Sequence, residues 1–203
     1  MRVRQITQNL IQLTRLHFVN AYLVREDDGF TLVDTLVPRS GDAVLAAAAE
    51  AGAPIRRIAL THGHGDHVGS LDELRGRLDG GVQVSMPVLD ARIHAGEKVV
   101  DEKLPGSWPD VETKPDLLLE PGDRVGSLEV IDAPGHTPGH VASLDTRDRT
   151  LPTGDVFTTL GGTAVSSHST VAIRARRRCA RSSAPIARSP DAPARSAALQ
   201  RLD

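Results

Sequence analysis

Four side chains of the kind that bind metal ions lie within six residues in the first half of the chain. They are His62, His64, Asp66 and His67. Imidazole and carboxylate groups are the usual protein ligands of zinc, and iron and manganese also accept them. In an extended loop His62 and His64 would face the same way, because side chains alternate along such a chain. A lone loop histidine is usually only a polar surface residue, but this density of ligand types predicts a metal site.

The residues on either side of this cluster predict a loop between a strand and a helix. The apolar run 58–61 is typical of a buried strand, and residues 68–75 carry apolar side chains at helical spacing. Gly63 and Gly65 allow the backbone to turn tightly between the ligands. The cluster is therefore expected at the end of a strand.

Two later segments offer further ligands of the same kinds. His136 and His140 flank Pro-Gly turns, and Asp155 directly follows Gly154. Proline and glycine restrict the backbone around such side chains, which suits a metal ligand. Each of these signals is weak alone, but with the first cluster they provide ligands from three separate turns. We therefore expect the three turns to meet at one edge of a sheet.

In these segments the chain resembles the metallo-β-lactamase-fold metallo-hydrolases, a superfamily that includes glyoxalase II. The resemblance rests on HxHxDH at residues 62–67, on the histidines of Pro134–His140 and on Gly154-Asp155, which occur in the family's order. The stretch Leu32-Val33-Asp34-Thr35 is also similar to an early family strand that contains an aspartate. The resemblance covers about residues 5–170. It implies an α+β fold, a four-layer αββα sandwich, with a two-metal site at one edge.

The resemblance also implies which residues would hold the cations. The ligands of the first ion would be His62, His64 and His136. The second ion would be held by Asp66 and His67, and Asp155 would bridge both ions. His140 has no ligand role in the family pattern and is expected to support the site by hydrogen bonding. The expected cofactors are two Zn²⁺ ions, with iron or manganese as alternatives.

Two cations in such a site would lower the pKa of a bridging water and give hydroxide near neutral pH. The hydroxide would attack an ester, thioester, lactone or amide bond of a small-molecule substrate, and a metal would stabilise the oxyanion. Asp66 is the predicted catalytic residue, because its carboxylate can orient the hydroxide or carry a proton. The predicted function is therefore metal-dependent hydrolysis. The alternative is a catalytically silent metal-binding or interaction protein on the same fold.

The chain departs from the family pattern after Asp155. The family has a last histidine for the second ion well beyond the bridging aspartate, and here only His168 follows, too close to match. Residues 171–203 contain no Gly, Lys, Glu or His and are mainly Ala, Arg, Ser and Pro. We expect a domain at 1–170, a disordered or out-of-frame tail at 171–203, a fold incomplete at its C-terminus and a weakened second metal site. A frameshift near residue 169 would explain the tail, and reading the gene in its other frames tests this hypothesis.

Charge is unevenly distributed between these two parts. Residues 1–170 carry 16 Lys and Arg against 24 Asp and Glu, a net charge of −8, and residues 171–203 carry 8 Arg and 2 Asp, a net charge of +6. A basic arm for nucleic acid is the rival interpretation of the tail. The tail lacks aromatic residues for base stacking, and the acidic balance of residues 1–170 argues against a nuclease.

Other features of the sequence indicate where in the cell the protein would act. Cys179 is the only cysteine, so the chain can form no intrachain disulfide. The first residues lack the apolar core of a signal peptide, and no run reaches the ~18 apolar residues of a membrane span. We therefore expect a cytoplasmic protein with no membrane partner. The sequence does not predict an oligomeric state.

An irregular insertion is predicted at about residues 97–115, which are polar and contain Pro105, Gly106 and Pro109. Trp108, the only tryptophan, is either a lid over a pocket or packing for this loop. His94 is expected on a helix face and not as a ligand. The remaining pattern predicts helices at 43–51 and 87–96 and strands at 6–13, 18–24, 30–34, 82–85, 117–119, 125–131 and 141–144.

Overall fold

The computed structural model describes residues 1–78, 81–101, 103–158 and 164–165. The largest sheet contains β1 (Arg2–Gln5), β2 (Leu10–Arg15), β3 (Val19–Glu26), β4 (Gly29–Val33), β5 (Ile55–Ala59), β6 (Gln83–Pro87) and β7 (Leu117–Leu119). A second sheet contains β8 (Arg124–Val125), β9 (Leu128–Asp132) and β10 (Val141–Asp145), and β11 (Phe157–Thr158) pairs with β12 (Ala164–Val165). The helices are α1 (Gly41–Glu50), α2 (Gly65–Val68), α3 (Leu71–Arg77), α4 (Val88–His94) and the 3₁₀-helix η1 (Gly154–Val156).

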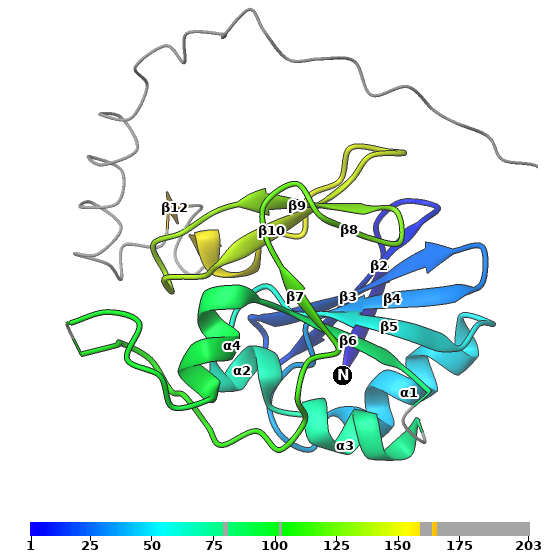
Figure 1. Ribbon diagram of the computed structural model, residues 1–203. Helices are drawn as coiled ribbons and strands as arrows, with labels where there is room; N and C mark the ends of the chain where they lie inside the picture. The colour runs from blue at the N-terminus through cyan, green and yellow to red at the C-terminus, as the bar shows by residue number, and fades with distance from the viewer. Residues whose placement is uncertain (79–80, 102, 159–163, 166–203) are drawn as a thin grey trace, which may run out of the picture.

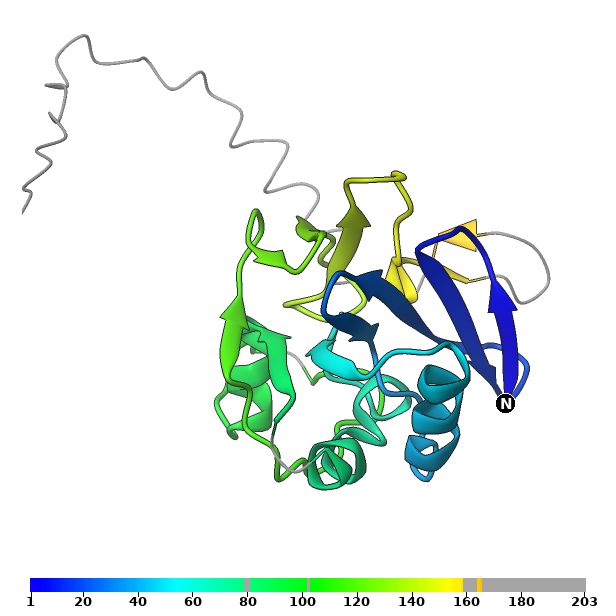
Figure 2. The ribbon, with the colours of Figure 1, turned by 90° about the vertical axis from the view of Figure 1, so that its right-hand side faces the viewer.

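These elements are stacked in layers. Helices α1 to α4 lie on one face of the seven-stranded sheet, and the three-stranded sheet β10-β9-β8 lies over the other face (Figure 1). The view turned by 90° in Figure 2 shows α1 and α3 on the side of the large sheet that faces away from β9 and β10. Three of the four layers expected for an αββα sandwich therefore lie within the described residues.

The strand directions bring distant parts of the chain to one edge of the large sheet. Strands β1 to β4 are antiparallel, whereas β4, β5, β6 and β7 run parallel to one another. The carboxyl ends of parallel strands lie at the same edge, which is where α/β proteins place their sites. Asp34 follows β4, His62 follows β5, and Asp90 lies in the first turn of α4 after β6. The topology therefore gathers these three residues at one edge.

The core beneath this edge is mainly aliphatic, as a chain with only three Phe and one Trp requires. Leu13, Phe30 and Leu32 from the sheet are fully buried, and Leu71 and Leu74 of α3 belong to the same cluster. Burial of a side chain of this size stabilises the fold by ~1.5–3 kcal/mol relative to exposure. The ligand loops are therefore anchored to a well-packed core and do not project from the surface.

The structure corrects two predicted strands. Residues Arg2–Gln5 form β1, an edge strand whose side chains are all exposed, so no apolar alternation marks it in the sequence. The strand predicted at 6–13 begins only at Leu10. The strand predicted at 125–131 is divided by a turn at Gly126, whose φ is +60°, so that β8 and β9 form a hairpin.

The predicted tail at 171–203 lies outside the described residues, as do the boundary near residue 170, His168 and Cys179. The two-part division of the chain therefore stays a prediction. Within the described ranges, every helix is too short or too polar to pass through a lipid bilayer.

Candidate metal centre

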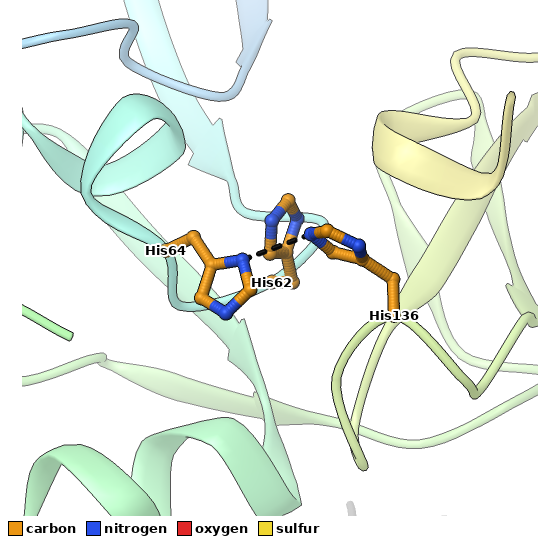
Figure 3. Close-up of side chains that lie close together, drawn as sticks. All are labelled: His62, His64 and His136. Carbon is orange, nitrogen blue, oxygen red and sulfur yellow. Dashed lines mark hydrogen bonds between the residues drawn. The ribbon is translucent and has the colours of Figure 1, made fainter. Parts of the chain in front are cut away.

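Three histidine rings from two distant loops meet at the edge of the sheet (Figure 3). His62 and His64 come from the loop after β5, and His136 comes from the loop between β9 and β10. The ring centroids are 4.9 Å apart for His62 and His64, 4.9 Å for His62 and His136, and 4.7 Å for His64 and His136. One nitrogen from each ring lies within 4.8 Å of the others. Two of the three turns predicted to meet therefore lie side by side.

A second group of possible ligands adjoins the first and shares a histidine with it. Its members are His62, His67 and Asp155, whose nearest ligand atoms also lie within 4.8 Å of one another. Oδ1 of Asp155 is 3.2 Å from Nε2 of His67, and Oδ2 is 3.3 Å from Nε2 of His136. The Asp155 carboxylate thus faces a histidine of each group, which is the placement a bridging ligand needs.

Asp66 lies at the border of this arrangement. Its Oδ2 is 3.8 Å from Nε2 of His67, and its side chain is 40% exposed, against 4% for His67. Neither of the two ligand groups found among the described residues includes Asp66. The structure therefore brings five of the six predicted ligands into these groups and leaves Asp66 at the solvent side of His67.

The buried carboxylate of Asp34 orients the loop after β5. Its Oδ1 accepts a hydrogen bond from the Thr61 N–H, and its Oδ2 accepts one from the Thr61 hydroxyl, both at 2.8 Å. Because the Thr61 hydroxyl donates to Asp34, its oxygen must accept from Nδ1–H of His62, which is 3.1 Å away. Nε2 of His62 then carries the lone pair. The same Asp34 oxygen accepts a bond of 2.8 Å from Nδ1–H of His67.

His62 supplies the test of whether a cation fits here. Its ring is fully buried, and Nε2 has no hydrogen-bond partner among the described residues. A buried acceptor left unpaired costs about 1–3 kcal/mol, so such an atom calls for a specific explanation. Burial, and then the neighbouring histidines, place the pKa of His62 well below its usual range, so the ring is neutral. Neutral imidazole is the form that binds metal, and the donor set fits a divalent cation such as zinc.

His64 has its ligand atom selected in a similar way. Its Nε2 is 3.1 Å from the Pro105 carbonyl oxygen, which can only accept, so Nε2 carries the proton. Nδ1 then presents its lone pair to Nε2 of His136 at 2.9 Å. A proton or a cation is needed between two ring nitrogens at this distance. The backbone of the insertion therefore decides which nitrogen of His64 is available to a metal.

The ionisation of His67 and Asp155 is strongly coupled. Burial alone would lower the pKa of His67, but the charges and hydrogen bonds of Asp34 and Asp155 outweigh it and raise this pKa to about 10. Burial would raise the pKa of Asp155, but the hydrogen bond and charge of His67 bring it down to about 2. Without a cation, a proton on His67 thus partly offsets the carboxylates. Binding of a metal to Nε2 requires the loss of this proton.

His140 supports the site without joining either ligand group. Its Nε2 accepts a hydrogen bond of 3.1 Å from the backbone N–H of Asp155, which confirms the expected supporting role. Burial, and then the neighbouring His136, lower the pKa of His140 to about 3, so the ring stays neutral and can accept this bond. Gly154 has φ +52°, and a Cβ there would lie 2.6 Å from Oγ1 of Thr61 and 2.7 Å from Nε2 of His140. Only glycine allows η1 to approach so closely.

The insertion packs against the ligand loop. The Trp108 ring lies 5.0 Å from the His64 ring in an edge-on arrangement, and its Nε1 donates to the Pro105 carbonyl at 2.9 Å. The Gly65 N–H donates to the Ser107 carbonyl at 2.9 Å. The sequence predicts that Trp108 is either a lid over a pocket or packing for the insertion. Its contacts show that it packs within the insertion and that its ring lies beside His64.

Two residues of α4 also contact the loop after β5. His94 lies outside both ligand groups, and its Nε2 donates to the Gly63 carbonyl at 2.9 Å. Asp90 is fully buried and accepts hydrogen bonds from both ligand loops, yet it belongs to no motif in the sequence. The available signal is a carboxylate in an otherwise apolar run, between Leu89 and Ala91.

Known proteins with similar sequences identify the family. The sequence model of the metallo-beta-lactamase superfamily matches residues 14–197. The chain belongs to this superfamily. The match begins at residue 14, inside the range of about 5–170 to which the motifs pointed, and extends beyond that range to residue 197. The fold is the metallo-β-lactamase fold, and the superfamily consists of hydrolases that typically bind metal ions, usually zinc.

Several curated relatives are similar to this member of the superfamily. The uncharacterized protein YobT of Bacillus subtilis (strain 168) is 41% identical over 175 residues, which is 82% of this chain and 74% of YobT. The probable metallo-hydrolase YybB of the same organism is 33% identical and covers 70% of this chain and 63% of YybB. A hydroxyacylglutathione hydrolase of Cereibacter sphaeroides is 36% identical over 62% of this chain and 42% of the relative. The chain thus spans less than two thirds of the last two relatives.

Solved structures agree with this assignment. A subclass B3 metallo-beta-lactamase of Bradyrhizobium japonicum is 27% identical, with a TM-score of 0.57 over 70% of this chain and 56% of that one. A metallo-beta-lactamase of Cronobacter sakazakii, 22% identical, shares the fold with a TM-score of 0.62 over 74% of this chain and 60% of that one. The chain again spans less than two thirds of these proteins.

Proposed function

We propose that this chain is a metal-dependent hydrolase that cleaves an ester, thioester, lactone or amide bond of a small-molecule substrate. The observation that carries the proposal is a pair of ligand groups that share His62, in which the Asp155 carboxylate of the second group faces His136 of the first. Nε2 of His62, buried and unpaired among the described residues, supports a cation at this place. Membership of a superfamily of metallo-hydrolases supports the reaction class.

The donor atoms suggest how two cations would be held. His62, His64 and His136 would bind the first, Asp66 and His67 the second, and Asp155 both. Zinc suits imidazole and carboxylate ligands best, with iron or manganese as alternatives. The second site is expected to be the weaker, since the side chain of Asp66, one of its ligands, is 40% exposed. When bound, a cation pair supplies a water of lowered pKa and a Lewis acid.

The residues of the chain have separate tasks in this proposal. Asp66, on the solvent side of His67, is placed to take up a proton or to orient a water. Pro105 and Trp108 form a wall that limits the access of water to His64. Beside this wall lies a cleft whose lining includes Val100, Lys103 and Leu104 together with Pro138 and residues of the His136 loop.

A catalytically silent metal-binding or interaction protein is the second candidate. It is favoured by a single observation, the position of Asp66 outside both ligand groups found among the described residues. A silent protein would bind metal without turnover, so the two candidates differ in one measurable property.

The test is hydrolysis by the full 203-residue chain loaded with zinc, manganese or iron(II), offered an aryl ester, a thioester, a lactone and a β-lactam. We expect turnover of at least one substrate, its loss with a chelator and its recovery when metal is restored. His136→Ala should abolish turnover, whereas His17→Ala, in an exposed turn and outside both ligand groups, should not. Metal binding without any turnover would favour the silent protein, and turnover that resists the chelator and His136→Ala would refute both.

A further inference from the structure

One carboxylate of α4 reaches both ligand loops at once. Oδ2 of Asp90 accepts hydrogen bonds from the Gly63 N–H at 2.8 Å and from the Thr137 hydroxyl at 2.7 Å. Oδ1 accepts from the Gly139 N–H at 2.9 Å. Gly63 lies between the ligands His62 and His64, and Thr137 directly follows His136. The contacts join segments that are 27 to 49 residues from Asp90 along the chain.

The surroundings of this carboxylate leave no room for another arrangement. Asp90 is 0% exposed, so water cannot replace its partners. A Cβ on Gly139 would lie 2.7 Å from Oδ1 and 2.9 Å from the backbone N of Asp90, so the loop approaches α4 as closely as only glycine permits. The spacing between the two loops is therefore set where they touch this side chain.

We propose that Asp90 is a positioning residue that holds the His62–His64 loop and the His136 loop at the separation the first metal site requires. The inference rests on the proposed function, because it assigns Asp90 to a site where metal binding is itself proposed. Three donors converge on two oxygens that only accept. An asparagine of the same shape would present N–H to at least one of these donors, which would push the loops apart.

A matched control exists in the same chain. Asp145 is also 0% exposed and also accepts three hydrogen bonds, all of them from Arg147. It lies at the far end of β10, four residues beyond Val141 and so ~13 Å farther along the strand from the ligand loop. Asp145→Asn therefore perturbs a buried carboxylate of the same kind without touching either ligand loop.

The experiment compares Asp90→Asn with Asp145→Asn in the full chain. The affinity for the first equivalent of Zn²⁺ is measured by competition with a chromophoric chelator, and the geometry of the site is followed by the visible absorption of Co²⁺. Thermal unfolding of the metal-free chains reports stability separately. We expect Asp90→Asn to lower the affinity for the first equivalent of Zn²⁺ about 10- to 100-fold, as the loss of a hydrogen-bond partner of a metal ligand does. The visible spectrum of bound Co²⁺ should also change. Asp145→Asn should lower stability and leave both metal readouts unchanged.

Thr137 provides a second test in case Asp90→Asn does not fold. Thr137→Val removes one of the three hydrogen bonds to Asp90 at nearly constant side-chain size, and it should lower the affinity for the first equivalent of Zn²⁺ several-fold. Thr137→Ser keeps the hydroxyl and should bind Zn²⁺ as the unsubstituted chain does. Equal metal affinity and an unchanged Co²⁺ spectrum in folded Asp90→Asn, or in Thr137→Val, would overturn the inference. Failure of the unsubstituted chain to bind Zn²⁺ or Co²⁺ would instead overturn the proposed function.

Discussion

The two sides of the candidate metal centre are held in very different ways. On the side of the loop after β5, the backbone and the rings are tied to two buried carboxylates, Asp34 and Asp90. On the side of η1, the backbone of Asp155 has a hydrogen bond to Nε2 of His140, and its 38% exposed side chain faces His67 and His136. The comparison indicates that the first ligand group is preorganised before a cation arrives. The bridging position depends more on the cation itself.

The largest expected effect separates the two groups by the number of metal ions bound. His62 is a proposed ligand of the first ion and also belongs to the second group, whereas loss of Asp155 would still leave three histidines for the first ion. His62→Ala should therefore weaken both equivalents of zinc, and Asp155→Asn mainly the second. The loss for His62→Ala should exceed the roughly 10–100-fold effect of an outer-shell change. Equilibrium dialysis followed by elemental analysis measures both, with His17→Ala as the control. The same stoichiometry in both variants would remove the distinction between the two sides.

The next effect concerns the stability of the loop after β5, the side of the site that buried carboxylates hold. Asp34 and His67 are 2% and 4% exposed and form a hydrogen-bonded pair of 2.8 Å, so Asp34→Ala would leave Nδ1–H of His67 and the two Thr61 donors without an acceptor. Loss of one partner from a buried pair costs ~3–5 kcal/mol. Urea unfolding of the metal-free chain should show this decrease.

Asp28 supplies the control for that substitution, because its carboxylate is paired with Arg57 at the surface, where water screens the charges. Asp28→Ala should change the unfolding free energy far less than Asp34→Ala. If the two variants were equally stable, the Asp34 contacts would not be what holds this side of the site.

A smaller effect is expected where η1 approaches the site. Gly154→Ala would add strain at φ +52° and place a Cβ 2.6 Å from Oγ1 of Thr61, so it should cost ~1–3 kcal/mol and weaken the second equivalent of zinc. Gly52→Ala has φ +82° but no atom within 4 Å, so it isolates the backbone strain from the clash. Equal effects of the two variants on zinc binding would show that the close approach of Gly154 does not position Asp155.

The smallest effect lies at the opposite end of the sheet and depends on pH. Hydrogen bonds from the Arg75 guanidinium and the Val84 N–H lower the pKa of Asp116, which precedes β7. A carboxyl with a lowered folded-state pKa contributes stability above its unfolded pKa of ~3.9, and this is lost as the pH falls through the folded pKa. Asp116→Asn should remove this part of the acid destabilisation, worth less than ~1 kcal/mol for such an exposed pair. Unfolding at pH 6 and pH 3 measures it, and zinc affinity at neutral pH should not change.

The predictability of the fold followed the strength of the local pattern. The helices α1 and α4 and the strands β4, β6 and β7 lie close to their predicted ranges, because apolar periodicity and turn residues mark them. The strand predicted at 58–61 is instead β5 (Ile55–Ala59), which begins three residues earlier because its first half contains the polar residues Arg56 and Arg57. Strand β1 is polar on both faces and pairs only through its backbone, so nothing in its own residues distinguishes it from a loop. The apolar run predicts one strand at 125–131, but a turn at Gly126 divides it into β8 and β9. A single glycine in an apolar run does not distinguish a hairpin from a continuous strand.

The predictability of the site followed a different rule. Ligand chemistry is a property of single residues and short spacings, so HxHxDH at 62–67, His136 and Asp155 could be selected from the sequence alone. The sequence also predicts that His94 is not a ligand, and in the structure its Nε2 donates a hydrogen bond to the Gly63 carbonyl. Residue types and short spacings therefore establish which side chains are able to bind a metal, and that they follow strands.

Only the tertiary structure decided which of them face one another and what holds them there. His64 and His136 are 72 residues apart in the chain, and Asp34 and His67 are 33 apart, so no local pattern encodes either contact. The sharing of His62 between the two ligand groups, the outer position of Asp66 and the junction made by Asp90 arise because the loops at one edge of the parallel strands meet the β9–β10 loop and η1. A buried carboxylate between two loops is specified by packing and hydrogen bonding across the fold, and these exist only once the chain has folded.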